Sequence, residues 1–199
     1  MKIILFTTFF NTDLQQGYQF LHLFFSQCLP SLYHQSFSDW ELHLFIHFQL
    51  HSSIISYLEQ YELPQIHIHY INQEQEWVQL SDIICSSQTN EYASCILSYY
   101  QSISPQLFNI IQPYSLLKHH IISFSSYLGY EPDTQKWISK KLSNKFLFAI
   151  QQNIYSLHSS NDSDQLNENF EFLNQQSIIN HSYENAIGDG QYILIGASN

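Results

Sequence analysis

The first half of the sequence alternates short apolar runs with longer segments in which apolar residues recur at helical spacing. Strands are predicted over residues 2–10, 40–48, 66–71 and 81–85, helices over 18–32 and 52–61, and a loop or short helix over 72–79. Strands that alternate with helices in this way form a mainly parallel sheet with helices on its faces. Such a sheet binds ligands outside the carboxyl ends of its strands. The pattern therefore predicts an α/β fold with a binding edge.

The second half is less regular along the chain. A helix is predicted over residues 93–103, and two β segments over 119–130 and 136–150 flank a turn at 131–134. Proline is favoured at the second position of such a turn, and Pro132 stands there. Residues 161–174 are polar and compatible with a helix, and residues 191–195 fit a late strand. Without an internal repeat or a long linker, residues 1–199 are expected to form one domain.

Composition excludes several classes of partner. Hydrophobic residues make up 44% of the 199, which is enough for a core. Six lysines and no arginine face 17 acidic residues, so the net charge of −11 disfavours nucleic acid and anionic membrane surfaces. No run approaches the length of about 20 apolar residues that a membrane span requires. Three cysteines without a CxxC spacing indicate a reducing compartment, and a cytoplasmic location is expected.

Several landmarks resemble a bacterial rhamnosyltransferase family of GT-A type. The first strand ends in Thr8-Phe9-Phe10-Asn11, similar to the family's Thr-Arg-Phe-Asn. The segment Cys28-Leu29-Pro30-Ser31-Leu32, followed by Gln35 and Trp40, is the nearest match. Asn144-Lys145-Phe146 and the pair His181 and Asn185 are similar to later landmarks of the family. The resemblance implies a GT-A, Rossmann-like fold with a nucleotide-binding half over 1–92 and an acceptor half over 93–199.

The resemblance also implies a reaction. A sugar, rhamnose among the options, would pass from a nucleotide-sugar donor to a glycan acceptor, with Mg²⁺ or Mn²⁺ bridging the donor diphosphate. The family holds this ion with paired carboxylates in a loop after a central strand. Here the family's aspartate-rich pattern is replaced over residues 87–92, where Glu91 is the single carboxylate. The alternative is a catalytically inactive GT-A-fold protein that serves in binding or as a scaffold, with a protein partner.

The site residues follow from the same alignment of landmarks. Metal ligation is assigned to Glu91 and His181, and deprotonation of the acceptor to Asp133, with Asp82 as a second candidate base. Substrate contacts are assigned to Thr8, Asn11, Ser87, Thr89 and Asn90. Each residue also has an ordinary interpretation. Glu91 fits the first turn of a helix, Thr89 and Asn90 fit a turn and cap, and His181 is one of eleven histidines.

Other chemistries have weaker support in the sequence. His67 and His69 project to one face of their strand and could form a zinc site with His119 or His120, although no cysteine or carboxylate stands at a supporting spacing. Lysines at 136, 140, 141 and 145 could meet a diphosphate or form a solvated face. Only five glycines are present, and none lies in a phosphate-binding loop or a G-x-S-x-G turn.

Overall fold

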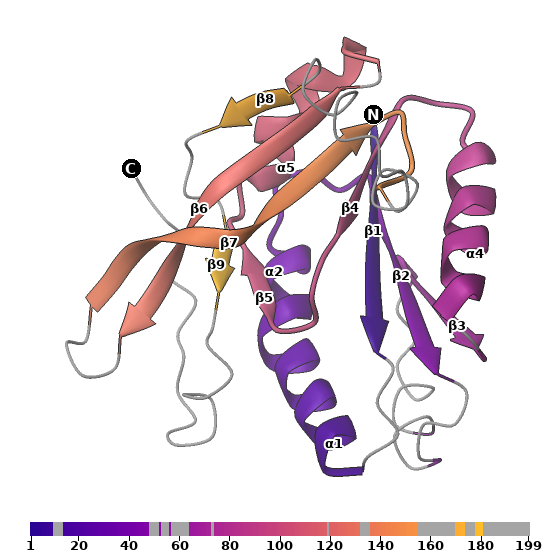
Figure 1. The fold of residues 1–199 in the computed structure, drawn as a ribbon, viewed down its shortest axis with the longest axis vertical. Helices are drawn as coiled ribbons and strands as arrows, with labels where there is room; N and C mark the ends of the chain where they lie inside the picture. Colours follow the sequence, from indigo (N-terminus) through magenta and orange to yellow (C-terminus); the bar gives the residue numbers. More distant parts are fainter. Residues whose placement is uncertain are drawn as a thin grey trace.

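A computed structural model describes residues 1–9, 14–47, 52, 56, 64–72, 74–118, 120–131, 136–154, 170–173 and 178–180. The strands of this part of the chain form one sheet in the order β3-β2-β1-β4-β7-β6-β9-β5, with β8 beside β6 (Figure 1). Their bounds are β1 Lys2–Phe9, β2 Trp40–His47, β3 Ile66–Ile71, β4 Tyr92–Ile96, β5 Gln101–Ile103, β6 Ile121–Glu131, β7 Lys136–Ile150, β8 Phe170–Leu173 and β9 Ile178–Asn180.

Four neighbouring strands, β3, β2, β1 and β4, run parallel to one another. Three of them, β1, β2 and β3, were expected as strands that alternate with helices, and the predicted α/β class is confirmed. Central strand β1 is apolar on both faces, since Ile3, Ile4, Leu5 and Phe6 are all fully buried. Strands buried on both faces have such continuous apolar runs. Antiparallel pairing begins where β4 meets β7.

One face of the sheet is covered by the predicted helix over residues 18–32. It consists of α1 (Leu14–Leu23), a π-helix over Phe24–Cys28 and α2 (Leu29–Tyr33), and α5 (Leu107–Ile111) packs into the same cluster. Pro30 stands in the first turn of α2, where its missing N–H is harmless. Cys28, Leu29 and Leu32 are buried, so the segment that most resembles the rhamnosyltransferase family forms core.

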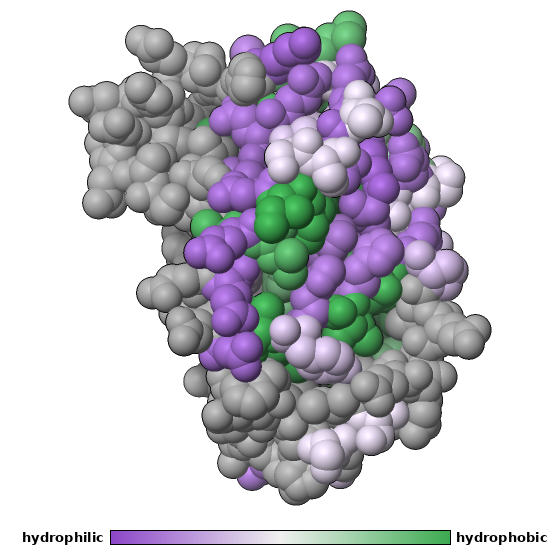
Figure 2. Space-filling model, turned by 90° about the vertical axis from the view of Figure 1, so that its right-hand side faces the viewer, coloured by the Kyte–Doolittle hydropathy of each residue, from purple (hydrophilic) through white to green (hydrophobic). Residues whose placement is uncertain are grey.

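The opposite face is covered by α4 (Glu74–Ser86), and the strand predicted over 81–85 is therefore wrong. Trp77, Leu80 and Ile84 are spaced three or four residues apart and pack toward the sheet, whereas Ile83 is 62% exposed. A short apolar run cannot be assigned to strand or helix from periodicity alone. Figure 2 views the α4 side, where hydrophilic surface surrounds separate hydrophobic patches.

The helix predicted over residues 93–103 is also wrong, because β4 and β5 occupy that segment. Ala93, Ser94 and Cys95 are fully buried between β1 and β7. Alanine and serine have weak strand propensity, and here the tertiary setting overrides it. The loop over 87–91 consequently precedes the central strand β4 instead of following a strand.

The predicted β-hairpin of the second half is confirmed as β6 and β7, whose antiparallel pairing shifts register between Phe124 and Ser126. Residues 170–173 form β8, so the helix expected over 161–174 is wrong for those four residues. Residues 132–134 of the turn predicted over 131–134, the strand predicted over 191–195 and most of the helix predicted over 52–61 lie outside the described residues. No helix in the described part of the chain is long and apolar enough to cross a membrane.

Candidate functional site

The predicted site residues of the 87–91 loop lie at the amino ends of the parallel strands. The Ser87 hydroxyl donates to the Ile84 carbonyl at 2.8 Å, which places Ser87 at the end of α4. Thr89 and Asn90 are exposed. The Glu91 carbonyl accepts a hydrogen bond from the Lys2 amide at 2.8 Å, next to the start of β1. The expectation that this loop follows a strand is corrected by this placement.

Thr8 lies at the other end of the same strand. Six residues of extended chain separate Lys2 from Thr8, a span of about 20 Å. The structure therefore does not bring Thr8 together with Ser87, Thr89, Asn90 and Glu91. Asn11, Asp133 and His181, the other predicted site residues, lie outside the described residues.

The carboxyl ends of β1 and β4 form the edge at which a parallel sheet binds ligands. The Thr7 hydroxyl donates to the Leu97 carbonyl at 2.6 Å, and the Leu97 amide donates to the Phe6 carbonyl at 2.8 Å. Two further bonds close the turn that follows, from the Gln101 amide to the Ser98 carbonyl at 2.9 Å and from the Ser98 amide to Gln101 Oε1 at 3.0 Å. These bonds give the edge a fixed backbone.

The loop after β4 has the sequence Leu97-Ser98-Tyr99-Tyr100 and contains no carboxylate. The Tyr99 ring packs edge-on against Phe9, with ring centroids 5.7 Å apart, and against Tyr100 at 5.3 Å. Hard cations such as Mg²⁺ take oxygen ligands, usually with one or two carboxylates. This loop does not fit the metal-binding carboxylate pair of the GT-A type. The sequence did not point to it because a helix was predicted there.

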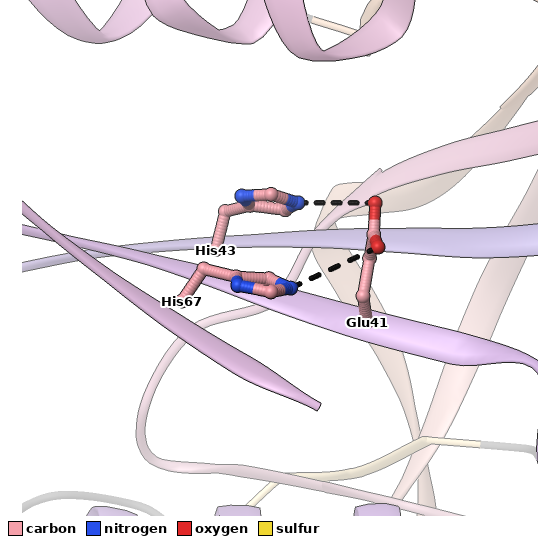
Figure 3. A group of neighbouring side chains, drawn as sticks. All are labelled: Glu41, His43 and His67. Atoms are coloured by element: carbon pink, nitrogen blue, oxygen red, sulfur yellow. Dashed lines mark hydrogen bonds and ion pairs between the residues drawn. The ribbon is translucent and has the colours of Figure 1, made fainter. Parts of the chain in front are cut away.

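A cluster of ionisable side chains lies on the α4 side of β2 and β3 (Figure 3). Glu41 and His43 alternate with buried residues of β2, and the parallel register pairs His43 with His67 of β3. Nε2 of His43 lies 3.1 Å from Glu41 Oε1, and Nε2 of His67 lies 3.9 Å from Glu41 Oε2. His43 Nδ1 is 2.9 Å from Nε2 of His69. The cluster joins two neighbouring strands through their side chains.

Glu41 supplies the negative charge of the cluster, and basic side chains surround its carboxylate. The Lys2 ammonium lies 2.5 Å from Glu41 Oε2. Burial alone would raise the pKa of Glu41, but the hydrogen bonds from His43 and Lys2 and their positive charge outweigh it and lower this pKa to about 2. Burial, with His43 and His67 nearby, lowers the pKa of His69 to about 4. Glu41 is thus a carboxylate and His69 a neutral imidazole at neutral pH.

Glu41, His43 and His67 form a possible metal-binding group, since one ligand atom from each lies within 4.8 Å of the others. The sequence correctly put His67 and His69 on one strand face, but the expectation that no carboxylate supports them is wrong. Glu41 supplies it from the neighbouring strand. The signal was present in the alternation of Glu41 and His43 with apolar residues. Of the two partners considered instead, His119 lies outside the described residues, and His120 has Nδ1 3.1 Å from the Lys118 carbonyl in the segment before β6.

Comparison with known proteins supplies the fold. No family model matches the sequence, and no curated protein matches it. A crystal structure of S. aureus TarS 1–349 superposes with a TM-score of 0.58 at 8% identity, over 91% of this chain and 60% of that chain. TarS 1–349 in complex with UDP-GlcNAc gives 0.58 at 10% identity, over 97% and 62%. The complex with UDP gives 0.56 at 9%, over 92% and 61%.

This chain spans 60–62% of the length of those TarS structures, and at such identity the likeness concerns the fold alone. The parallel strands and the helices on both faces of the sheet agree with the same class. The chain therefore has the mixed α/β fold of the GT-A glycosyltransferases.

Proposed function

We propose that this chain is a glycosyltransferase-like protein that binds a nucleotide-sugar donor at the carboxyl ends of β1 and β4. The observation that carries the proposal is the edge itself, where Thr7 and Leu97 join the two strand ends through a buried hydrogen bond of 2.6 Å. Ligands of open α/β sheets bind at this edge. Structures of similar fold were solved with UDP-GlcNAc and with UDP, which supports the same ligand class here.

Aromatic rings supply the apolar part of the proposed donor site. Tyr99 packs edge-on against the stacked pair Phe9 and Phe20, with centroid distances of 5.7 and 5.3 Å, and Tyr100 packs edge-on against Tyr99. A base that stacks on an aromatic side chain gains about 1–3 kcal/mol. We assign the base of the nucleotide to Tyr100. Thr8, at the same edge, remains our candidate for a polar contact to the donor.

The diphosphate of the donor would meet few cations. The chain has no arginine, and the loop after β4 offers no carboxylate for Mg²⁺ or Mn²⁺. We therefore expect nucleotide binding without a requirement for either ion at this loop. The proposed donor site uses the end of β1 and the loop after β4, so it draws on both predicted halves, 1–92 and 93–199.

Transfer to a glycan acceptor is the reaction that we propose for this site, with rhamnose as one donor sugar to test. The segment that most resembles the rhamnosyltransferase family contributes Cys28, Leu29 and Leu32 to the core. It supports the fold and has no bearing on which sugar is bound.

Thermal unfolding with nucleoside diphosphates and nucleotide sugars, each with and without Mn²⁺, tests the donor site. A ligand that binds only the folded state stabilises it by about 2.7 kcal/mol at a hundredfold excess over its dissociation constant. We expect Tyr100→Ala to reduce the shift. Tyr33→Ala is the matched control, because Tyr33 is 46% exposed at the far end of α2. Glu91→Ala is expected to leave the shift unchanged, and its loss of binding would restore the 87–91 loop as the site.

The absence of charged ligands in the 97–100 loop favours a second candidate, a GT-A-fold protein that binds without transferring sugar. Release of nucleoside diphosphate from each nucleotide sugar, with and without candidate glycans, separates the two. Binding accompanied by release supports a transferase. Binding without release under every condition supports the binding protein.

A further inference from the structure

We propose that Glu41, His43 and His67 form a binding site for a borderline transition-metal ion of the Zn²⁺ class on the α4 side of β2 and β3. The site is distinct from the proposed donor edge and needs no nucleotide. It rests on the geometry of three side chains and on a fourth, His69, that orients one of them.

The separations of the ligand atoms agree with one bound ion. Two atoms that each lie 2.0–2.1 Å from a tetrahedral Zn²⁺ are roughly 3.4 Å apart. Glu41 Oε1 and His43 Nε2 are 3.1 Å apart, and one ligand atom from each of Glu41, His43 and His67 lies within 4.8 Å of the others. The first pair is already close to the tetrahedral value, and rotation of the more exposed His67 ring would bring its nitrogen to a similar distance. Both strands that hold the ligands are fixed by a parallel ladder.

His69 contacts the ring nitrogen of His43 that would face away from the ion, as the partners of metal-binding histidines do. Such a histidine donates its other ring N–H to an acceptor, which fixes its tautomer and leaves the first nitrogen free for the ion. The Nδ1 of His43 lies 2.9 Å from Nε2 of His69, and their rings are nearly parallel at 14°. In the metal-free chain His43 Nε2 faces the Glu41 carboxylate, which can only accept a hydrogen bond. With the ion bound, His43 would carry its proton on Nδ1, toward His69, and present Nε2 to the ion.

Lys2 shares the Glu41 carboxylate with the proposed ion, and the exposure of His67 gives the ion access from solvent. A carboxylate has about four acceptor positions on its two oxygens, so Glu41 can keep Lys2 on Oε2 while Oε1 binds the ion. The His67 side chain is 46% exposed, in contrast to 8% for His43. The ion therefore has a route from solvent and a free coordination position for water.

The ligand set determines the class of metal. Imidazole suits Zn, Cu, Fe and Ni, whereas Mg²⁺ and Ca²⁺ take oxygen ligands. Two imidazoles and one carboxylate thus select a transition metal over Mg²⁺. Because the ligands come from two strands, the ion would cross-link β2 to β3 and bind the folded chain alone.

Titration of the metal-free full chain with Co²⁺, followed by displacement with Zn²⁺, tests the site. Intense visible absorption bands of four-coordinate Co²⁺ are expected, and Zn²⁺ should abolish them at one equivalent per chain. The His67→Ala variant removes an exposed ligand and should bind at least about tenfold more weakly. His69→Ala, which removes the orienting contact and leaves the three ligands in place, should weaken binding by about 10–100-fold.

His22→Ala is the matched control, because His22 is exposed on α1, on the opposite side of the sheet. Circular dichroism checks that each variant is folded. If His67→Ala does not fold, His67→Gln is used in its place. Equal affinity in the wild type and the His67 variant would overturn the proposal, as would absorption of six-coordinate Co²⁺ only. Weaker binding in the His22 variant than in the His67 variant would assign the metal to the surface histidines and would also overturn it. None of these readouts depends on nucleotide binding.

Discussion

The side-chain amide nitrogen of Asn153 lies 2.6 Å from Oδ1 of Asp82 and ties the segment after β7 to α4. The same amide donates to the Ser81 hydroxyl at 2.9 Å. Asp82 was considered as a catalytic base, and the structure gives it a contact in helix packing. Asn153 is 8% exposed and Ser81 is fully buried, so the bond between these two is shielded from water, whereas Asp82 is exposed.

Asn153→Ala is predicted to lower the free energy of unfolding by about 1–3 kcal/mol, since a buried polar partner loses its hydrogen bond. Urea denaturation measures the change. Asn109→Ala is the control, because the Asn109 amide bonds to Ser36 at the exposed surface. An equal effect of the two substitutions would contradict a special role for the α4 contact.

Gln35 links the end of α2 to the segment before α5. Its amide donates to the carbonyls of Ser31 at 3.0 Å and Ser104 at 2.7 Å. Gln35→Ala is predicted to destabilise the protein by roughly 1–3 kcal/mol, because the buried Ser31 carbonyl loses this donor, while the Ser104 carbonyl keeps the Leu107 amide as a partner. The comparison is Gln88→Ala, whose amide bonds to Ile84 within its own helix region, and which should change the denaturation midpoint little.

The three cysteines are predicted to resist alkylation in the native protein. Burial raises the pKa of the Cys28 and Cys95 thiols far above the usual range, and burial together with the negative charge of Asp82 raises that of Cys85 to about 12. The thiolate is the reactive form, so labelling must wait for opening of the fold. A thiol reagent followed by mass spectrometry should show slow labelling in buffer and three labels in denaturant. Rapid native labelling at any cysteine would contradict the packing.

Acid is predicted to destabilise the metal-free protein through Glu41. Its pKa falls from the usual 4.5 to about 2 in the folded state, so its contribution is complete above pH 4.5 and disappears as the pH falls toward 2. The groups that face it are Lys2 of β1, His43 and His67 on β2 and β3, and Cys85 of α4.

Denaturation midpoints with a chelator at several pH values in this window measure the effect. Glu41→Gln keeps the shape of the side chain and removes its titration. The variant should therefore lose less stability than the wild type between pH 4.5 and 2. Parallel slopes in the two proteins would show that other carboxylates cause the acid sensitivity.

Sequence patterns identified the strands in which apolar residues are continuous or alternate with polar ones. β1, β2 and β3 were predicted within one or two residues, because continuous or alternating apolar runs bounded by polar residues leave few options. The failures fall where composition is ambiguous. The apolar residues within 81–85 fit the spacing of a strand as well as that of a helix. The middle of β4 consists of small residues, which form a strand because they are buried between β1 and β7.

The Glu41 cluster was predicted only in part, for a related reason. His67 and His69 share a face by simple alternation along one strand. Their contact with Glu41 and His43 depends on the register between β2 and β3, which pairs His43 with His67. No local pattern encodes that register. It follows from packing of both faces of the finished sheet.

The parallel pairing of β2 with β3 has a kinetic consequence. His43 and His69 are 26 residues apart along the chain, and parallel strands cannot be joined by a tight turn. Loop closure must therefore be completed before these contacts contribute any free energy, and such non-local pairings form slowly. The ring contact between His43 and His69 is expected to appear late in folding, after the helices have formed. It would then report on completion of the sheet and not on the early collapse of the chain.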